Sequence, residues 1–295
     1  MQNFLKGNTD SLTKKASSLR LRSMEFADCF KSGSFRSHYR GQGMEFLGVR
    51  EYLVGDDVRS LDWNVTAKMG KPFVKMFEED HQLEIFLIVD RSFSMFTGSK
   101  GMVKYEKAAE TAALLTMASE LNSSPVGAVF FDGKIHFAVK SKSGRFQSML
   151  LLSRLDQASP VNNGSALKSA LNGAVKMLKN HSLIFVISDF RVSGWEETFK
   201  KLSWNHDVTL IKITDPSELE LPEIGTVPFT DSETGKRMVL PTSSPALKSL
   251  WREEYRKRSE NLKKLAQKNN AGFISISTEE DASHILSRYF RERRK

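Results

Sequence analysis

The 295-residue chain has a single cysteine and no long apolar run. Cys29 has no second cysteine to pair with, which excludes an internal disulfide and fits a reducing compartment. The apolar runs at 85–89 and 183–187 are far shorter than the roughly 18–20 residues that span a bilayer. The first thirty residues are basic and lack an apolar core, unlike a signal peptide. We therefore expect a cytoplasmic protein without a transmembrane segment.

Several motifs of catalysis and binding are also missing. The sequence has no Gly-x-x-x-x-Gly-Lys-Ser/Thr loop for ATP and no Gly-x-Ser-x-Gly turn for a hydrolase nucleophile. Its six histidines are scattered, without the spacing of a zinc site. No zinc-finger, RNA-recognition or helix-turn-helix pattern is present. These absences argue against a P-loop ATPase, a zinc protein and a sequence-specific nucleic-acid reader.

Basic residues outnumber acidic ones, which gives the chain a formal net charge of +9. The excess lies at the ends, where residues 1–40 hold eight Lys and Arg against three Asp and Glu, and the chain finishes in RYFRERRK. Basic ends can attract nucleic acid, an anionic membrane surface or an acidic protein. We favour a solvated surface over nucleic-acid binding, and peripheral membrane contact stays open.

From about residue 82 the sequence alternates between short apolar runs and helical patterns. We expect a turn at Asp132–Gly133 inside a hairpin over 125–139. This alternation predicts an α/β fold with a doubly wound, mostly parallel sheet that helices cover on both faces. The other expected strands are 83–90, 182–190, 208–213 and 271–277, and the expected helices are 103–122, 145–156, 164–180, 245–269 and 280–294.

Residues 1–81 do not follow this alternation, and we predict a separate appended segment there, ahead of a main domain over 82–295. The segment is basic and rich in Ser and Gly, and a helix near 11–31 followed by short strands is expected. Inside the main domain, five of the eight prolines fall in about 215–245. We interpret this stretch as an excursion from the sheet that carries a small hairpin around Thr234–Gly235.

The most informative stretch is LEIFLIVDRSFS, at 83–94. Its apolar residues predict a strand that is buried on both faces, and Asp90, Ser92 and Ser94 follow at a spacing of two. In a locally extended chain these side chains point the same way. One carboxylate and two hydroxyls suit a hard divalent cation such as Mg²⁺. The same residues can instead cap the next helix or form local turns.

The Asp-x-Ser-x-Ser pattern resembles the metal-ion-dependent adhesion site of von Willebrand factor type A domains. That family adds a Thr from a second loop and an Asp after a later strand, and the matching positions here are Ser165 and Asp189. The resemblance implies a divalent cation, Mg²⁺ first with Mn²⁺ or Ca²⁺ as alternatives. The implied role of the ion is to bind a carboxylate of a protein partner. The implied ligand set is Asp90, Ser92, Ser94, Ser165 and Asp189.

A wider resemblance covers roughly residues 35 to 290. The passage RGQGMEFLGVREYLVGDDVRSLDWN, followed by KPFVKMFEED and the Asp-x-Ser-x-Ser strand, is similar to the domain of unknown function 58 family. The later Asp215-Pro216, Leu221-Pro222 and Asp231-x-Glu233-Thr234-Gly235 also fit that family. The resemblance implies pairing with a MoxR-type AAA+ ATPase in a chaperone-like system that activates or assembles a client complex.

The passage at 40–64 contains a compact charged and aromatic group. Carboxylates and guanidinium groups at this density predict a network of bidentate pairs. We interpret the network as structural, fixing the N-terminal segment on the main domain, and a docking surface for a partner is the alternative. The group consists of Arg50, Glu51, Asp56, Asp57, Arg59, Asp62 and Trp63.

Taken together, the sequence predicts a non-catalytic, metal-dependent protein-interaction module. One rival is a divalent-metal hydrolase that uses the same carboxylates, although no general base or second set of metal ligands is evident. The other rival is a nucleic-acid binder that uses the basic ends.

Overall fold

The computed structural model describes residues 44–79, 84–99, 101–156, 164–220, 223–230 and 237–292. These residues fall into two compact units, a small one within 34–82 and a main one that includes 83–295. The expected helix near 11–31 and the expected turn at Thr234–Gly235 lie outside the described residues. Within the described ranges, no helix combines the length and the apolar character needed to cross a membrane.

The small unit is an antiparallel strand pair with a short helix between the strands. Strand β1 (Met44–Glu51) pairs with β2 (Phe73–Glu79). The 3₁₀ turn η1 (Val58–Ser60) and helix α2 (Trp63–Met69) connect them. Helix α2 begins where the Asp62 carboxylate accepts two backbone N–H groups and ends at Gly70, which adopts the left-handed conformation that favours glycine. The sequence predicted short strands here but not this helix.

The main unit is built on a six-stranded sheet with the order β10-β7-β6-β3-β4-β5. Only the edge strand β5 is antiparallel to its neighbour. When only the strands of this sheet are counted, in sequence order, the order is 3-2-1-4-5-6, that of a doubly wound α/β sheet. The predicted fold class is therefore confirmed. The strands are β3 (Glu84–Asp90), β4 (Val126–Phe131), β5 (Ile135–Lys142), β6 (Ser182–Ser188), β7 (Asp207–Thr214) and β10 (Gly272–Ser277).

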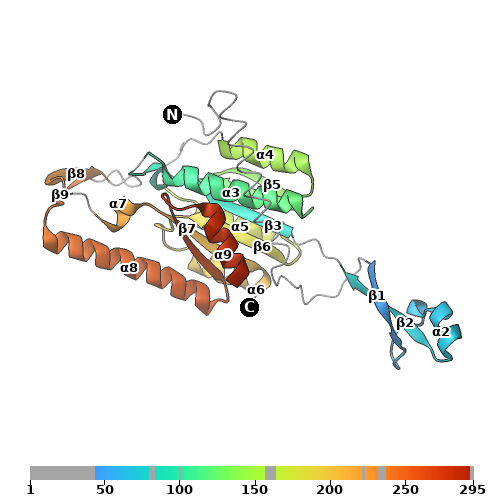
Figure 1. Ribbon diagram of the computed structural model, residues 1–295. Helices are drawn as coiled ribbons and strands as arrows, with labels where there is room; N and C mark the ends of the chain where they lie inside the picture. Colours follow the sequence, from blue (N-terminus) through green and yellow to red (C-terminus); the bar gives the residue numbers. More distant parts are fainter. Residues whose placement is uncertain are drawn as a thin grey trace. The chain divides into compact units, whose positions relative to one another are not determined.

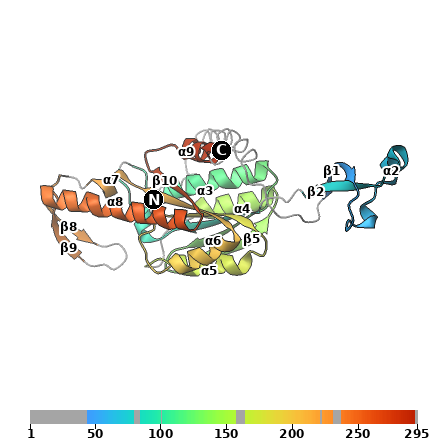
Figure 2. The same cartoon turned by 90° about the horizontal axis from the view of Figure 1, so that it is seen from below.

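Helices cover both faces of this sheet (Figures 1 and 2). On one face α3 (Lys104–Leu121) packs beside α4 (Arg145–Asp156) and α9 (Ala282–Glu292). On the other face α5 (Leu167–Met177) and α6 (Glu196–Asn205) form one apolar core with the final turns of α8. This two-sided cover explains the continuous apolar strands, because a parallel sheet between helices has no solvent-facing side.

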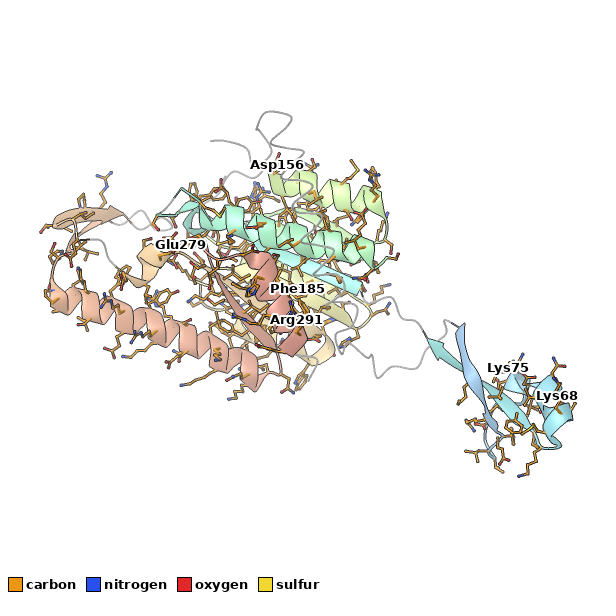
Figure 3. All side chains as sticks on the ribbon, in the orientation of Figure 1. Lys68, Lys75, Asp156, Phe185, Glu279 and Arg291 are labelled. Atoms are coloured by element: carbon orange, nitrogen blue, oxygen red, sulfur yellow. The ribbon has the colours of Figure 1, made fainter. Side chains whose placement is uncertain are left out.

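The central strands are buried along almost their whole length. Every residue of the run Ile85–Val89 in β3 and of Leu183–Ile187 in β6 is inaccessible to solvent. Phe185 of β6 contacts Phe290 of α9, with ring centroids 6.0 Å apart, and Figure 3 shows Phe185 within the main unit beside that helix. The sheet and its helices thus form one closely packed body that can hold loop residues in fixed positions.

Helices α5 and α6 differ from the sequence expectation. Helix α6 was not predicted, although Trp195, Phe199 and Leu202 lie at the spacing of a buried helical stripe. Helix α5 begins at Leu167 rather than at 164, because Gly164 adopts a φ of +85° that a helix cannot accommodate.

The Pro-rich excursion after β7 begins with the short helix α7 (Pro216–Leu219) and continues with β8 (Thr226–Thr230) and β9 (Arg237–Pro241). Strands β8 and β9 form an antiparallel pair, as the expected hairpin requires. Helix α8 (Pro245–Lys268) follows, with α7 and the hairpin at its N-terminal end (Figure 1). The buried residues of α8 are Leu262 and Ala266, near its C-terminal end, and they pack in the same apolar core as α5 and α6.

Candidate metal centre

Four neighbouring parallel strands end at an aspartate on the same edge of the sheet. Asp90 is the last residue of β3, and Asp132, Asp189 and Asp215 follow at the ends of β4, β6 and β7. The strand order reverses between β3 and β6, and ligands of doubly wound sheets bind in the crevice at such a reversal. The topology therefore brings the predicted residues Asp90 and Asp189 to the position in the fold that most favours a ligand.

Asp90 is almost inaccessible to solvent, and both of its carboxylate oxygens accept hydrogen bonds. The Ser92 backbone N–H donates to Oδ1 over 2.8 Å, and the Ser188 hydroxyl donates to Oδ2 over 2.6 Å. The first of these contacts is the local turn that the sequence allowed as an alternative. The second joins two strands that are 98 residues apart in the sequence, so Asp90 does more than close its own loop.

The two predicted serines of this loop face the same centre. They lie on or beside the 3₁₀ turn η2 (Phe93–Phe96), where both side chains are buried and their hydroxyl oxygens are 3.1 Å apart. Ser92 also hydrogen-bonds Asp90, and Ser94 hydrogen-bonds Asp189. Four of the five predicted ligands, Asp90, Ser92, Ser94 and Asp189, are thus connected directly to one another.

The fifth predicted ligand, Ser165, lies in the loop before α5. The next residue, Ala166, donates its backbone N–H to the carbonyl of Asp132 over 2.5 Å, which fixes the loop at the same edge of the sheet. The Ser165 hydroxyl oxygen is buried, and within the described part of the chain it has no hydrogen-bond partner. A buried hydroxyl without a partner is costly in free energy unless a ligand supplies the missing interaction.

The main feature that the sequence did not reveal is Lys104, at the start of α3. Its side chain is 0% exposed, and its Nζ lies 2.7 Å from Oδ2 of Asp189. The same ammonium group donates to Glu218 of α7, and Arg191 contacts Glu218 over 3.0 Å. In the sequence, Lys104 looks like a solvated residue in the first turn of a helix. No pattern of spacing indicated that it would be buried against a strand-end carboxylate.

The pKa values of the two central carboxyl groups, Asp90 and Asp189, shift in opposite directions. The pKa of Asp90 is raised to about 7, chiefly by burial and also by the Asp189 carboxylate, although hydrogen bonds from Ser188 and Ser92 offset part of the rise. Burial would also raise the pKa of Asp189, but the charge and hydrogen bond of Lys104, together with Arg191 and Ser94, lower that pKa below its ordinary value. Asp90 is therefore the carboxylate whose negative charge has the least compensation from protein groups.

The donor atoms at this edge fit a hard divalent cation. They are carboxylate and hydroxyl oxygens, which Mg²⁺, Mn²⁺ and Ca²⁺ prefer, and they include the unpartnered Ser165 hydroxyl. Across the described residues, no three His, Cys, Asp or Glu side chains lie together in a way that could hold a metal ion. An ion at this edge would therefore depend on the serine hydroxyls as well as on Asp90 and Asp189.

Asp215 has a different role, since it joins three segments of the main unit. Its carboxylate accepts hydrogen bonds from the backbone N–H of Ser99 and Ser217 and from the hydroxyls of Ser217 and Thr278. Burial would raise the pKa of Asp215, but these hydrogen bonds hold it well below the ordinary range. Asp215 therefore fixes the loop after η2, the start of α7 and the end of β10 relative to one another.

We expect Asp215→Ala to lower the free energy of unfolding by about 3 kcal/mol, because buried hydrogen bonds to a charged group are lost from several segments. Since its pKa is depressed in the fold, this contribution is complete above the pKa of an unfolded aspartate, about 3.9, and declines as the pH falls below that value. Urea unfolding of the variant and the wild type at neutral and acidic pH measures both effects.

Asp281 provides a matched control for that variant. It also accepts a backbone N–H and a hydroxyl from the serine two residues later, Ser283, but it is exposed. Asp281→Ala should cost only about 1 kcal/mol, the usual value for a lost helix cap. Equal losses for the two variants would show that Asp215 is merely a local cap.

In the small unit, the charged group organises its own turns. Arg50 and Asp56 form a bidentate pair over 2.7 and 2.8 Å, and the Asp56 carboxylate also accepts the backbone N–H of Leu53. Asp57 and Asp62 accept backbone N–H groups at the starts of η1 and α2.

The other predicted members of this group lie at the surface of the small unit. Glu51 pairs with Lys71, Arg59 is exposed, and the Trp63 side chain is 68% exposed. The predicted network of bidentate pairs is therefore wrong for the described part of this unit, which contains one such pair and several helix caps. The reason is that short aspartates before helical turns satisfy the backbone rather than the arginines.

Comparison with known proteins gives relatives along most of the chain. Proteins of Mycobacterium bovis and Mycobacterium tuberculosis that are described as uncharacterized are 27% identical over 259 residues, which are 86% of this chain and 81% of each relative. The BatB structure from Bacteroides thetaiotaomicron is 17% identical, with a TM-score of 0.44 over 72% of this chain and 98% of that one. The VWA domain of SpRpn10 is 13% identical, with a TM-score of 0.41 over 70% of this chain and 93% of that one.

The family model described as "Protein of unknown function DUF58" matches residues 48–261. This range runs from the charged group of the small unit through the candidate metal centre and into α8. The resemblance to this family that was drawn from the sequence is thereby confirmed: the chain belongs to the DUF58 family.

Proposed function

We propose that this protein is a metal-dependent protein-interaction module. The observation that supports the proposal is the convergence of Asp90, Ser92, Ser94 and Asp189 where the strand order reverses, with the unpartnered Ser165 hydroxyl at the same edge. The proposed ion is Mg²⁺, with Mn²⁺ or Ca²⁺ as alternatives. When bound, the ion supplies positive charge and an open coordination position, which attract a carboxylate of a partner.

The partner that we propose is a MoxR-type AAA+ ATPase, which the family resemblance implies. The chain would recognise an acidic side chain of that ATPase, and the two would form a chaperone-like system for activation or assembly of a client complex. We also propose a cytoplasmic location, because a chain with a single cysteine fits a reducing compartment.

We also propose that the site binds rather than catalyses. Asp189 is held by the Lys104 ammonium, so it is poorly suited to act as a general base. Within the described residues, the carboxylates at this edge do not form the larger cluster that a two-metal hydrolase needs. The hydroxyl-rich donor set is better suited to hold an ion for recognition.

A binding assay with purified components tests the proposal. The immobilised chain should retain the MoxR-type ATPase of the same organism in Mg²⁺ and release it when EDTA is added. Asp90→Ala should reduce retention to background, because it removes the carboxylate whose charge is least compensated by protein groups. Glu260→Ala, at an exposed residue of helix α8, is the control that should leave retention unchanged.

Two results would contradict the proposal. The first is retention that is indifferent to both EDTA and Asp90→Ala. The second is phosphoester hydrolysis by the chain alone in Mg²⁺ or Mn²⁺, if Asp90→Ala abolishes it. That outcome would favour the hydrolase over the binding module.

A further inference from the structure

The Asp189 carboxylate already has cationic neighbours without a metal ion. Asp189 interacts with Lys104 and Arg191, and Lys212 of β7 interacts electrostatically with both Asp189 and Glu218. Lys212 is itself buried, with its ammonium 4.4 Å above the ring of Tyr255. The group thus contains three carboxylates and three cationic side chains: Asp90, Asp189 and Glu218 on one side, Lys104, Arg191 and Lys212 on the other.

Lys104 is the cation of this group that most directly opposes a metal ion. Its ammonium lies 2.7 Å from Asp189, a predicted metal ligand, and the side chain has no exposure to solvent. The contact with Glu218 adds a second anchor, which keeps the ammonium from moving away into water. In a buried setting the repulsion between two positive charges a few ångströms apart is much stronger than in water. An ion beside Asp189 therefore meets a fixed opposing charge.

We propose that Lys104 lowers the affinity of the centre for a divalent cation, so that the ion binds firmly only together with the carboxylate of the partner. This inference rests on the proposed function, and it adds how binding of the metal ion is regulated by the partner. The partner's carboxylate supplies the negative charge that Lys104 has already neutralised. By linkage, the ion then raises the affinity for the partner by the same factor as the partner raises the affinity for the ion.

Titration of the full chain with Mn²⁺ alone, followed by electron paramagnetic resonance, tests the inference. Lys104→Met keeps the length of the side chain and removes its charge, and we expect it to bind Mn²⁺ at least about tenfold more tightly than the wild type. Lys104→Arg keeps the charge and should remain as weak as the wild type. A gain of affinity cannot result from a damaged site, so it separates this role from a merely structural one.

The bound ion is located by adding Asp90→Ala to Lys104→Met, which should abolish the tight Mn²⁺ binding. Equal affinity in the wild type and Lys104→Met would overturn the inference and leave the proposed function standing. Absence of Mn²⁺ binding from both proteins would overturn the inference and the metal centre together. If Lys104→Met does not fold, Lys104→Gln makes the same test and retains a hydrogen-bond donor. Glu218→Gln, which removes an anion, should shift the affinity in the opposite direction.

Discussion

The Asp189→Ala variant is expected to lose about 3 kcal/mol of unfolding free energy, because it leaves the Lys104 ammonium buried with fewer anionic partners. The wild-type pair is 2.7 Å apart, and both side chains are almost fully buried. An ammonium in such a place cannot regain its water shell without local unfolding. Urea unfolding in EDTA measures the loss, since a chelator removes any contribution from a bound ion.

A double-mutant cycle decides whether the loss comes from the ion pair. Asp189→Ala, Lys104→Met and the double variant are compared with the wild type in the same buffer. If the pair carries the effect, the double variant should be about 2 kcal/mol more stable than the sum of the single losses predicts. Strictly additive losses would mean that Asp189 and Lys104 stabilise the fold independently.

The positions of most candidate ligands could be predicted because the sequence shows where the buried strands end. Asp90 directly follows an apolar run, Asp189 follows another after one serine, and parallel strands place their carboxyl ends at one edge. Ser165 was identified chiefly through the family resemblance, since a loop of this kind has no periodic pattern. The same rule of strand ends applied to β4 and β7 would have added Asp132 and Asp215 to the group.

Lys104 and Glu218 could not be predicted in the same way. Both lie in the first turn of a helix, at positions that normally face water, and 114 residues separate them. Their burial depends on how α3 and α7 meet over the end of β6, which is a property of tertiary packing rather than of local sequence. The network of pairs predicted at 40–64 failed for a related reason, because local backbone groups compete for short aspartates.

The hairpin of β4 and β5 contains a constraint of another kind, at Gly127. The pairs on either side of it are Val126 with Lys142 and Ala128 with Val139, so two residues of β5 oppose this one glycine. This is a β-bulge on the edge strand. A Cβ atom added at Gly127 would lie 2.7 Å from the backbone nitrogen of Ser141 and 2.9 Å from the buried ring of Phe86. Neither neighbour is the free end of a flexible side chain.

We therefore expect Gly127→Ala to lower the free energy of unfolding by about 3 kcal/mol, since the extra methyl group forces the edge strand or Phe86 to move.

Gly173→Ala is the matched control. Gly173 lies in helix α5, where a new Cβ would meet only the tip of Ile135 at 3.8 Å. That change should stabilise the protein by about 0.5–1 kcal/mol, because alanine favours a helix more than glycine does. Urea unfolding should give shifts of opposite sign for these two substitutions. Similar shifts would mean that the backbone of β5 moves aside freely, in which case the bulge would not be fixed by the close approach of Gly127.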